Sequence, residues 1–245
     1  MSGSWVLFLL ILISSIPIIA VYIWFRLAKH QISIVRFLFA LLAGAAAFFP
    51  ALILQNLLSF SFPAQGRLAM FFEVFVRIAF TEELSRLLML FVFFKISSRI
   101  ASGRTPFRGT AADLHSEGPD TPNQPLSFNV IKMGTAIGLV AGLGFAIIES
   151  AVYGASNTNV LLLRAVTAAP LHAACGSRIG AAAVMFRTSP FQALFRLFAA
   201  AAIHGIYNFM AAMPGFPSIL AILITLSALM TSILIIRGAQ EPQYK

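Results

Sequence analysis

The sequence predicts an all-α membrane protein, a polytopic bundle of about seven transmembrane helices with its N-terminus outside and its C-terminus in the cytoplasm. The chain has 245 residues, of which 59% are hydrophobic and only 10% charged. One soluble core cannot bury that much apolar surface, so most of it must face lipid. Apolar runs long enough to cross roughly 30 Å of hydrocarbon recur along nearly the whole chain. Basic residues between these runs fit one membrane orientation.

The apolar runs define the expected helices, within a single transmembrane domain over residues 1–245. The predicted spans are residues 5–25, 35–58, 69–94, 130–154, 160–186, 191–213 and 216–236. The first run is followed by Arg26 and Lys29, whereas a secretory signal carries its positive charges before a shorter apolar stretch. We therefore expect this run to be retained as a helix.

The distribution of basic residues gives the expected orientation. Cytoplasmic loops of membrane proteins carry an excess of Lys and Arg. With the N-terminus outside, only Arg67 falls on the outer side. The basic residues on the inner side are Arg26, Lys29, Arg36, Lys95, Arg99, Arg104, Arg108, Lys132, Arg187, Arg196, Arg237 and Lys245. Topology thus accounts for the net charge of +9, and we expect the lipid bilayer, and no nucleic acid, as a partner.

One long connection interrupts the apolar pattern. Residues 97–129 are rich in Ser, Thr, Gly and Pro, which is typical of a flexible loop, here a cytoplasmic one. Asp113, His115 and Glu117 alternate within it and suggest a metal site. An unanchored loop loses much conformational entropy when it orders a ligand set, so we interpret them as solvated.

The third span contains charged residues at a depth where they are costly. On insertion scales a central charge costs roughly 2.5–3.5 kcal/mol, whereas each Leu, Ile, Phe or Val contributes only about 0.3–0.6 kcal/mol. Glu82 and Glu83 lie four and three residues before Arg86, so both carboxylates can approach one guanidinium. Adjacent glutamates point about 100° apart, which lets one pair with Arg86 while the other faces a cavity. Glu73 and Arg77 are expected to form an ordinary interfacial ion pair.

The fourth span combines a carboxylate with a seam of small residues. Glu149 follows Gly138, Gly142 and, on an adjoining face, Gly144. Small residues allow close approach between transmembrane helices. We expect this seam to pack against the helix that carries Glu82.

The fifth and sixth spans each contain a histidine. His172 shares one smooth face with Gly176 and Gly180, and His204 shares a face with Asn208. Each polar residue alone has a structural interpretation as an interhelical hydrogen-bonding group. Counted from the span ends, the glutamates and histidines of four helices lie at comparable depth, which favours a shared chemical role.

Such a group has the parts needed to hydrolyse a peptide bond. A glutamate can take a proton from water, while a His, an Asn or a metal stabilises the oxyanion. Glu149, His172 and His204 can also bind zinc with an open fourth position, which leaves Glu82 as the base. The H-E-x-x-H spacing of the zincin proteases is absent from the sequence.

Four ordered elements of the sequence resemble the PrsW family of intramembrane proteases, which is related to the CAAX prenyl-protease superfamily. The elements are Glu82, Glu83 and Arg86 in TEELSR, Phe145 with Glu149, Arg164 before His172, and His204 with Asn208 in HGIYNF. The family usually has Lys at the position of Arg86, a change that keeps the charge but not the shape. The resemblance covers about residues 81–209.

The resemblance implies a protease that cuts a membrane-anchored protein, as family members do when they release anti-sigma factors. Family members have been described both as metalloproteases and as glutamate proteases, and both versions stay open here. Zinc is the cofactor to consider, although we expect that catalysis does not strictly need it. For the glutamate version the implied roles are Glu82 as base, Glu83 as the partner of Arg86, Glu149 and His172 as helpers in activating water, and His204 with Asn208 as oxyanion donors.

Two other classes of function use the same residues. Chains of Glu, His and Arg in a helix bundle also relay protons, so a proton-coupled transporter or channel is the main alternative. That class is expected to show internal symmetry and paired broken helices, and no repeat is visible in the sequence. The second alternative is a non-catalytic scaffold, in which the buried charges only determine the register of the helices.

Overall fold

The computed structural model describes residues 3–28, 32–59, 66–102, 128–154, 164, 166–212 and 218–238. Within these ranges the regular structure is helical, and no strand occurs. The elements are α1 (Gly3–Leu27), α2 (Ile34–Ala46), α3 (Phe48–Leu58), α4 (Arg67–Phe72), η1 (Glu73–Phe80), α5 (Thr81–Ser102), α7 (Phe128–Gly154), α9 (Ala168–Met185), α10 (Pro190–Ala212) and α11 (Ser218–Arg237). Because α2 meets α3 at Ala47, and α4, η1 and α5 follow without a break, these elements form seven continuous segments in the described part of the chain.

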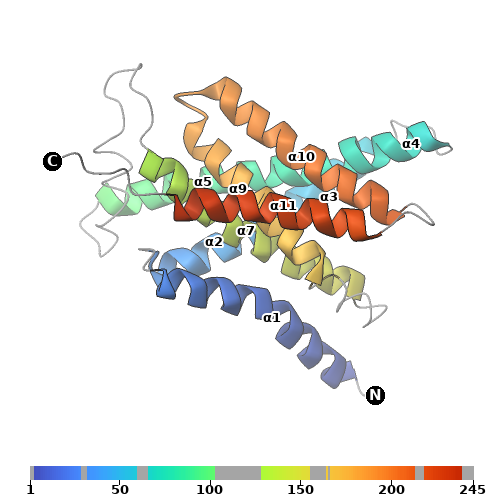
Figure 1. Cartoon of the computed structure of the whole chain (residues 1–245), viewed down its shortest axis with the longest axis horizontal. Helices are drawn as coiled ribbons and strands as arrows, with labels where there is room; N and C mark the ends of the chain where they lie inside the picture. The colour runs from blue at the N-terminus through green and yellow to red at the C-terminus, as the bar shows by residue number, and fades with distance from the viewer. Residues whose placement is uncertain are drawn as a thin grey trace.

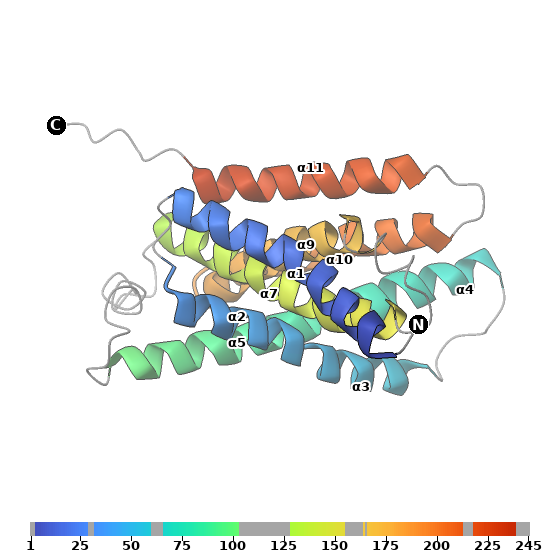
Figure 2. The same cartoon turned by 90° about the horizontal axis from the view of Figure 1, so that it is seen from below.

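The segments form a multi-pass membrane bundle, as predicted. Four described stretches are long and apolar enough to cross a membrane, namely Ile34–Leu58, Asn129–Tyr153, Pro190–Ala211 and Ile219–Arg237. The first helix begins, and α11 ends, at opposite ends of the long axis (Figures 1 and 2). This arrangement agrees with an odd number of crossings and with the expected placement of the two termini on opposite sides.

The helix α9 lies in the interior of the bundle. It contacts α5, α7, α10 and α11, and most of its side chains are buried. A helix that protein surrounds does not have to be strongly apolar, which explains why the Ala- and Gly-rich α9 can carry His172 and Arg178. The core of the bundle therefore contains a helix whose His172 and Arg178 are kept from lipid by the helices packed around it.

The glycine seam of α7 packs against α9, and not against the helix of Glu82 as we expected. A β-carbon added to Gly138 would lie 2.7 Å from the Cα of Gly180, and one added to Gly176 would lie 2.8 Å from the Cα of Gly142. Gly144 faces α2 at Leu41. The small residues of α7 meet the small residues of α9 because only two such faces allow the backbones to come this close.

Two features of the backbone around the third span differ from a plain helix over residues 69–94. The segment η1, directly before Glu82, is a π-helix of 8 residues. Such wider turns are rare and are found frequently at functional sites. At the other end α5 continues to Ser102, so the predicted loop of residues 97–129 begins later than expected. Its residues 103–127, with Asp113, His115 and Glu117, lie outside the described residues.

Candidate active site

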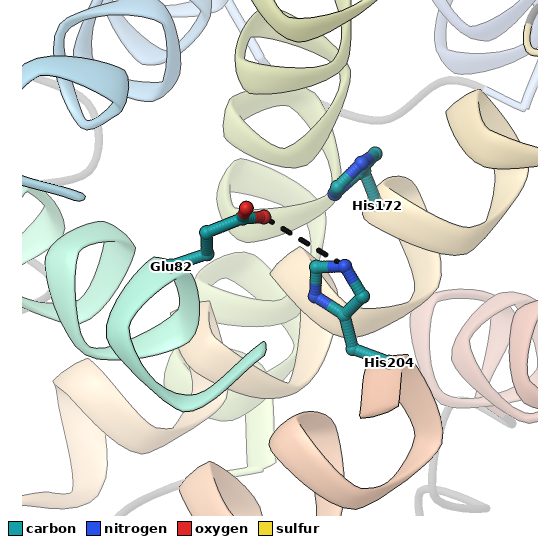
Figure 3. Close-up of side chains that lie close together, drawn as sticks. All are labelled: Glu82, His172 and His204. Carbon is teal, nitrogen blue, oxygen red and sulfur yellow. Dashed lines mark ion pairs between the residues drawn. The ribbon is translucent and has the colours of Figure 1, made fainter. Parts of the chain in front are cut away.

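Three helices bring Glu82, His172 and His204 together in the interior of the bundle (Figure 3). Glu82 lies in the first turn of α5, His172 in the first part of α9, and His204 in the middle of α10. One ligand atom from each of the three side chains lies within 4.8 Å of the others. All three residues are buried, with 4%, 1% and 1% of their surface exposed. We call these three residues the Glu/His/His cluster.

A second carboxylate orients one of the histidines. Glu83 pairs with Arg86 three residues later, as predicted, and its Oε1 accepts a hydrogen bond from Nδ1 of His204 at 2.8 Å. Because Nδ1 then carries the proton, Nε2 of His204 is left as the acceptor of the ring. This Nε2 lies 3.7 Å from Oε2 of Glu82. Glu83 and Arg86 therefore fix the tautomer and the direction of His204.

Glu149 holds the other histidine in the same way. Its Oε2 lies 2.5 Å from Nε2 of His172 and 2.7 Å from the guanidinium of Arg164. The Arg164 guanidinium also stacks over the ring of Tyr153, 4.5 Å from its centroid. The ring of His172 is thus left with Nδ1, which has no hydrogen-bond partner within the described residues. Each histidine has one nitrogen engaged by a carboxylate and one nitrogen left over.

Arg86 also contacts the helices α7 and α9. Its guanidinium donates to the main-chain oxygen of His172 at 3.4 Å and lies 4.7 Å from the centre of the Phe145 ring in α7. Its side chain is fully buried, and so is that of Glu83. A buried ion pair of this kind is strongly destabilised when one partner is removed, because the other charge is left without compensation.

The structure brings six of the seven predicted site residues into two adjoining contact groups. Glu82, Glu83, Arg86 and His204 form one group, and Glu149 with His172 forms the other. Asn208 lies one turn beyond His204 on α10 and is half-buried. Arg86 contacts Glu83, as expected, while Glu82 lies beside the histidines. The catalytic roles of these residues remain predictions.

The residues that can hold a metal differ from the predicted set in one member. The expected ligands were Glu149, His172 and His204, whereas the described residues that can share one ion are Glu82, His172 and His204. Glu149 instead contacts His172 from the other side, together with Arg164. The sequence cannot reveal this difference, because the choice between the two glutamates depends on how α5 and α7 are turned around α9.

The Glu/His/His cluster fits a zinc ion. Two imidazoles and one carboxylate are a common catalytic ligand set, which leaves a fourth position for water or substrate. In each histidine, the ring nitrogen that faces away from the cluster contacts a carboxylate, Glu83 for His204 and Glu149 for His172. Carboxylates in this position commonly orient imidazoles that bind a metal. Oε2 of Glu82 and Nδ1 of His172 are buried polar atoms without a hydrogen-bond partner in the described chain, and such atoms are costly unless something binds them.

One contact of the site was not expected from the sequence. Gln55, in α3, donates a hydrogen bond from Nε2 to Oε1 of Glu82 at 3.2 Å. The signal for it was a pair of adjacent amides, Gln55 and Asn56, near the end of a largely apolar span.

Comparison with known protein families agrees with this geometry. A family model described as PrsW family intramembrane metalloprotease matches residues 33–235. The matched region includes every helix that contributes to the site, from α3 to α10. No curated protein and no solved structure matches the chain.

Proposed function

The chain belongs to the PrsW family of intramembrane metalloproteases, and we propose that it hydrolyses a peptide bond of a membrane-anchored protein at the Glu/His/His cluster. The observation that carries this proposal is the convergence of Glu82, His172 and His204 from three helices within a lipid-embedded bundle (Figure 3). Intramembrane ionisable groups are expensive, so their retention favours a chemical role. A single-span protein of the anti-sigma-factor type is the substrate class that we propose.

For the reaction without a bound metal, we assign the first proton transfer to Glu82. One of its oxygens, Oε2, is buried, is not used in a hydrogen bond within the described residues, and lies beside His204. In this position it accepts a proton from water while the oxygen of that water attacks the scissile carbonyl, and it then delivers the proton to the leaving amine. Asn208, on the same face of α10 as His204, is the proposed donor to the oxyanion. His204, which we also expected in this role, already donates the one N–H of its neutral ring to Glu83.

Glu83, Arg86 and Glu149 act as supporting groups in this proposal. Glu83 and Arg86 hold the His204 ring, and Glu149 holds the His172 ring, so neither imidazole has to reorganise during the reaction. Groups that are already oriented contribute more to catalysis in a buried site than the same groups would in water.

If zinc is the family's metal here, we propose that Glu82, His172 and His204 hold it. A zinc ion supplies Lewis acidity, which polarises the carbonyl and lowers the pKa of bound water. Elemental analysis of active, detergent-purified protein tests this assignment. Stoichiometric zinc that is lost in His204→Ala would support it and would contradict the sequence-based expectation that zinc is dispensable. Full activity without any metal would support Glu82 alone as the activating group.

Substitution in cells tests the function itself. Glu82→Gln and His204→Ala, co-expressed with a membrane-anchored substrate, are expected to insert at normal levels and to stop cleavage, because general-base catalysis contributes about 10²–10⁴-fold. Comparing membrane proteomes with wild type and with Glu82→Gln identifies candidate substrates, which accumulate uncut in the variant. Normal cleavage by both variants would exclude proteolysis at this cluster.

A proton-coupled transporter is the less favoured alternative. The same carboxylates and imidazoles are found in proton relays, but the chain matches a protease family over most of its length.

A further inference from the structure

A polar side chain from outside the predicted site contacts Glu82. The amide nitrogen of Gln55 donates to Oε1 of Glu82 at 3.2 Å, and an ionised carboxylate can only accept. The other oxygen, Oε2, lies 3.7 Å from Nε2 of His204 and has no hydrogen-bond partner in the described chain. The two oxygens of this carboxylate therefore have different surroundings, one held by an amide and one turned toward a histidine.

The face of α3 that carries Gln55 is packed into the bundle. Ala47, Ala51 and Gln55 recur every four residues and so lie on one side of the helix axis. Ala47 and Ala51 are completely or almost completely buried, in a cluster with Phe145 of α7. Small side chains at these two positions bring the backbone of α3 close to its neighbours, and the longer Gln55 side chain then reaches Glu82.

The main chain and the side chain of Gln55 both contact the continuous segment formed by η1 and α5. Its carbonyl oxygen accepts a hydrogen bond from Nη1 of Arg77 at 3.4 Å, and Arg77 is in turn paired with Glu73. Arg77 lies in η1 and Glu82 in the first turn of α5, so the two contacts lie on either side of the point where the π-helix ends. Gln55 is thereby fixed relative to Glu82 through both its backbone and its amide.

We propose that Gln55 is a positioning residue of the reaction centre, which holds Oε1 of Glu82 so that Oε2 faces the histidines. This inference rests on the proposed function, in which Glu82 either activates water or holds the metal. A carboxylate without this hydrogen bond can rotate about its last torsion, so Oε2 no longer keeps its direction toward the histidines. Loss of such an outer contact typically lowers activity or metal affinity by about 10–100-fold.

The test uses the full chain in lipid vesicles with a single-span reporter that the wild type cleaves, labelled on both sides of its membrane segment. Gln55→Met removes the donor with little change in volume. Asn56→Met places the same side chain one residue later, on the exposed side of α3, and serves as the matched control. We expect Gln55→Met to lower kcat roughly 10- to 100-fold with KM within about twofold, and Asn56→Met to cleave like wild type.

A second variant keeps the test decisive if Gln55→Met fails to fold, which its melting temperature in detergent reveals. Gln55→Leu also removes the donor, with a shorter apolar side chain, so the same loss of kcat is expected. A kcat within about twofold of wild type in either folded variant, a loss confined to KM, or an equal loss in Asn56→Met would overturn the inference. Cleavage that persists in Glu82→Gln would remove the proposed function itself, whereas loss in Glu82→Gln with normal Gln55 variants removes only this inference.

Discussion

Arg86 and Arg178 both lie within the helix bundle, and their surroundings differ in kind. Arg178, on α9, donates to the main-chain oxygens of Ala174 and Ala228, at 2.8 and 3.2 Å, and to the hydroxyls of Ser232 and Thr231, at 3.2 and 2.7 Å. Its contacts join α9 to α11 through neutral acceptors, with both terminal nitrogens in use.

Arg86 belongs to a cluster in which hydrogen bonding is incomplete. Its terminal nitrogen pairs with Glu83, but its Nε, Oε2 of Glu82 and Nδ1 of His172 have no hydrogen-bond partner within the described residues. A buried polar network that serves stability alone tends to be fully satisfied. The Arg178 network links helices, and the difference between the two regions supports our proposal that the Arg86 region is arranged for chemistry.

The largest expected effect comes from breaking the ion pair of the reaction centre. Arg86→Met leaves Glu83 as a buried charge without its partner, which typically costs about 3–5 kcal/mol. We expect a large drop in the melting temperature in detergent together with loss of cleavage. Arg86→Lys, the residue usual in the family, should recover most of both, and a Met variant as stable as wild type would contradict the assigned role of the pair.

An intermediate effect is expected at the contact of α7 with α9. Gly138→Val places a side chain against the backbone of Gly180, and overpacking of this kind costs about 1–3 kcal/mol. Because α7 carries Glu149 and α9 carries His172, cleavage should fall along with the melting temperature. Ala151→Val, on an exposed part of α7, is the matched control and should change neither. An unchanged Gly138→Val variant would show that the two helices are not in close contact.

The smallest expected effect is at the second arginine. Arg178→Met removes four hydrogen bonds to neutral partners, worth about 0.6 kcal/mol each by typical interhelical values, and this loss is partly offset because a buried charge is removed as well. We expect a modestly lower melting temperature and an unchanged cleavage rate per folded molecule. A folded Arg178→Met variant that cannot cleave would mean that this network also serves the reaction.

The sequence predicted most of the local arrangement of the site, because helix geometry determines which neighbours along one helix can meet. The pairing of Glu83 with Arg86 and the pairing of Glu73 with Arg77 both follow from spacings of three and four residues, and both are present. The shared depth of the glutamates and histidines also followed from counting along apolar spans.

The sequence could not determine which helix faces which. Gly138 and Gly142 indicated a close partner, which we expected to be the helix of Glu82, whereas the partner is α9 with Gly176 and Gly180. The contact of Gln55 with Glu82 and the choice of Glu82 over Glu149 as the third member of the cluster have the same origin. The π-helix before Glu82 also depends on packing, since its sequence, EVFVRIAF, is equally compatible with an ordinary α-helix.

The most direct measurement compares Glu82→Gln with Arg178→Met in the same lipid vesicles, as the cleavage rate per folded molecule beside the melting temperature. Glu82→Gln is predicted to lose at least about 100-fold in cleavage rate with little change in melting temperature. Arg178→Met is predicted to keep the cleavage rate and to have a modestly lower melting temperature. Normal turnover by a folded Glu82→Gln variant would contradict the claim that the Glu/His/His cluster carries out the hydrolysis.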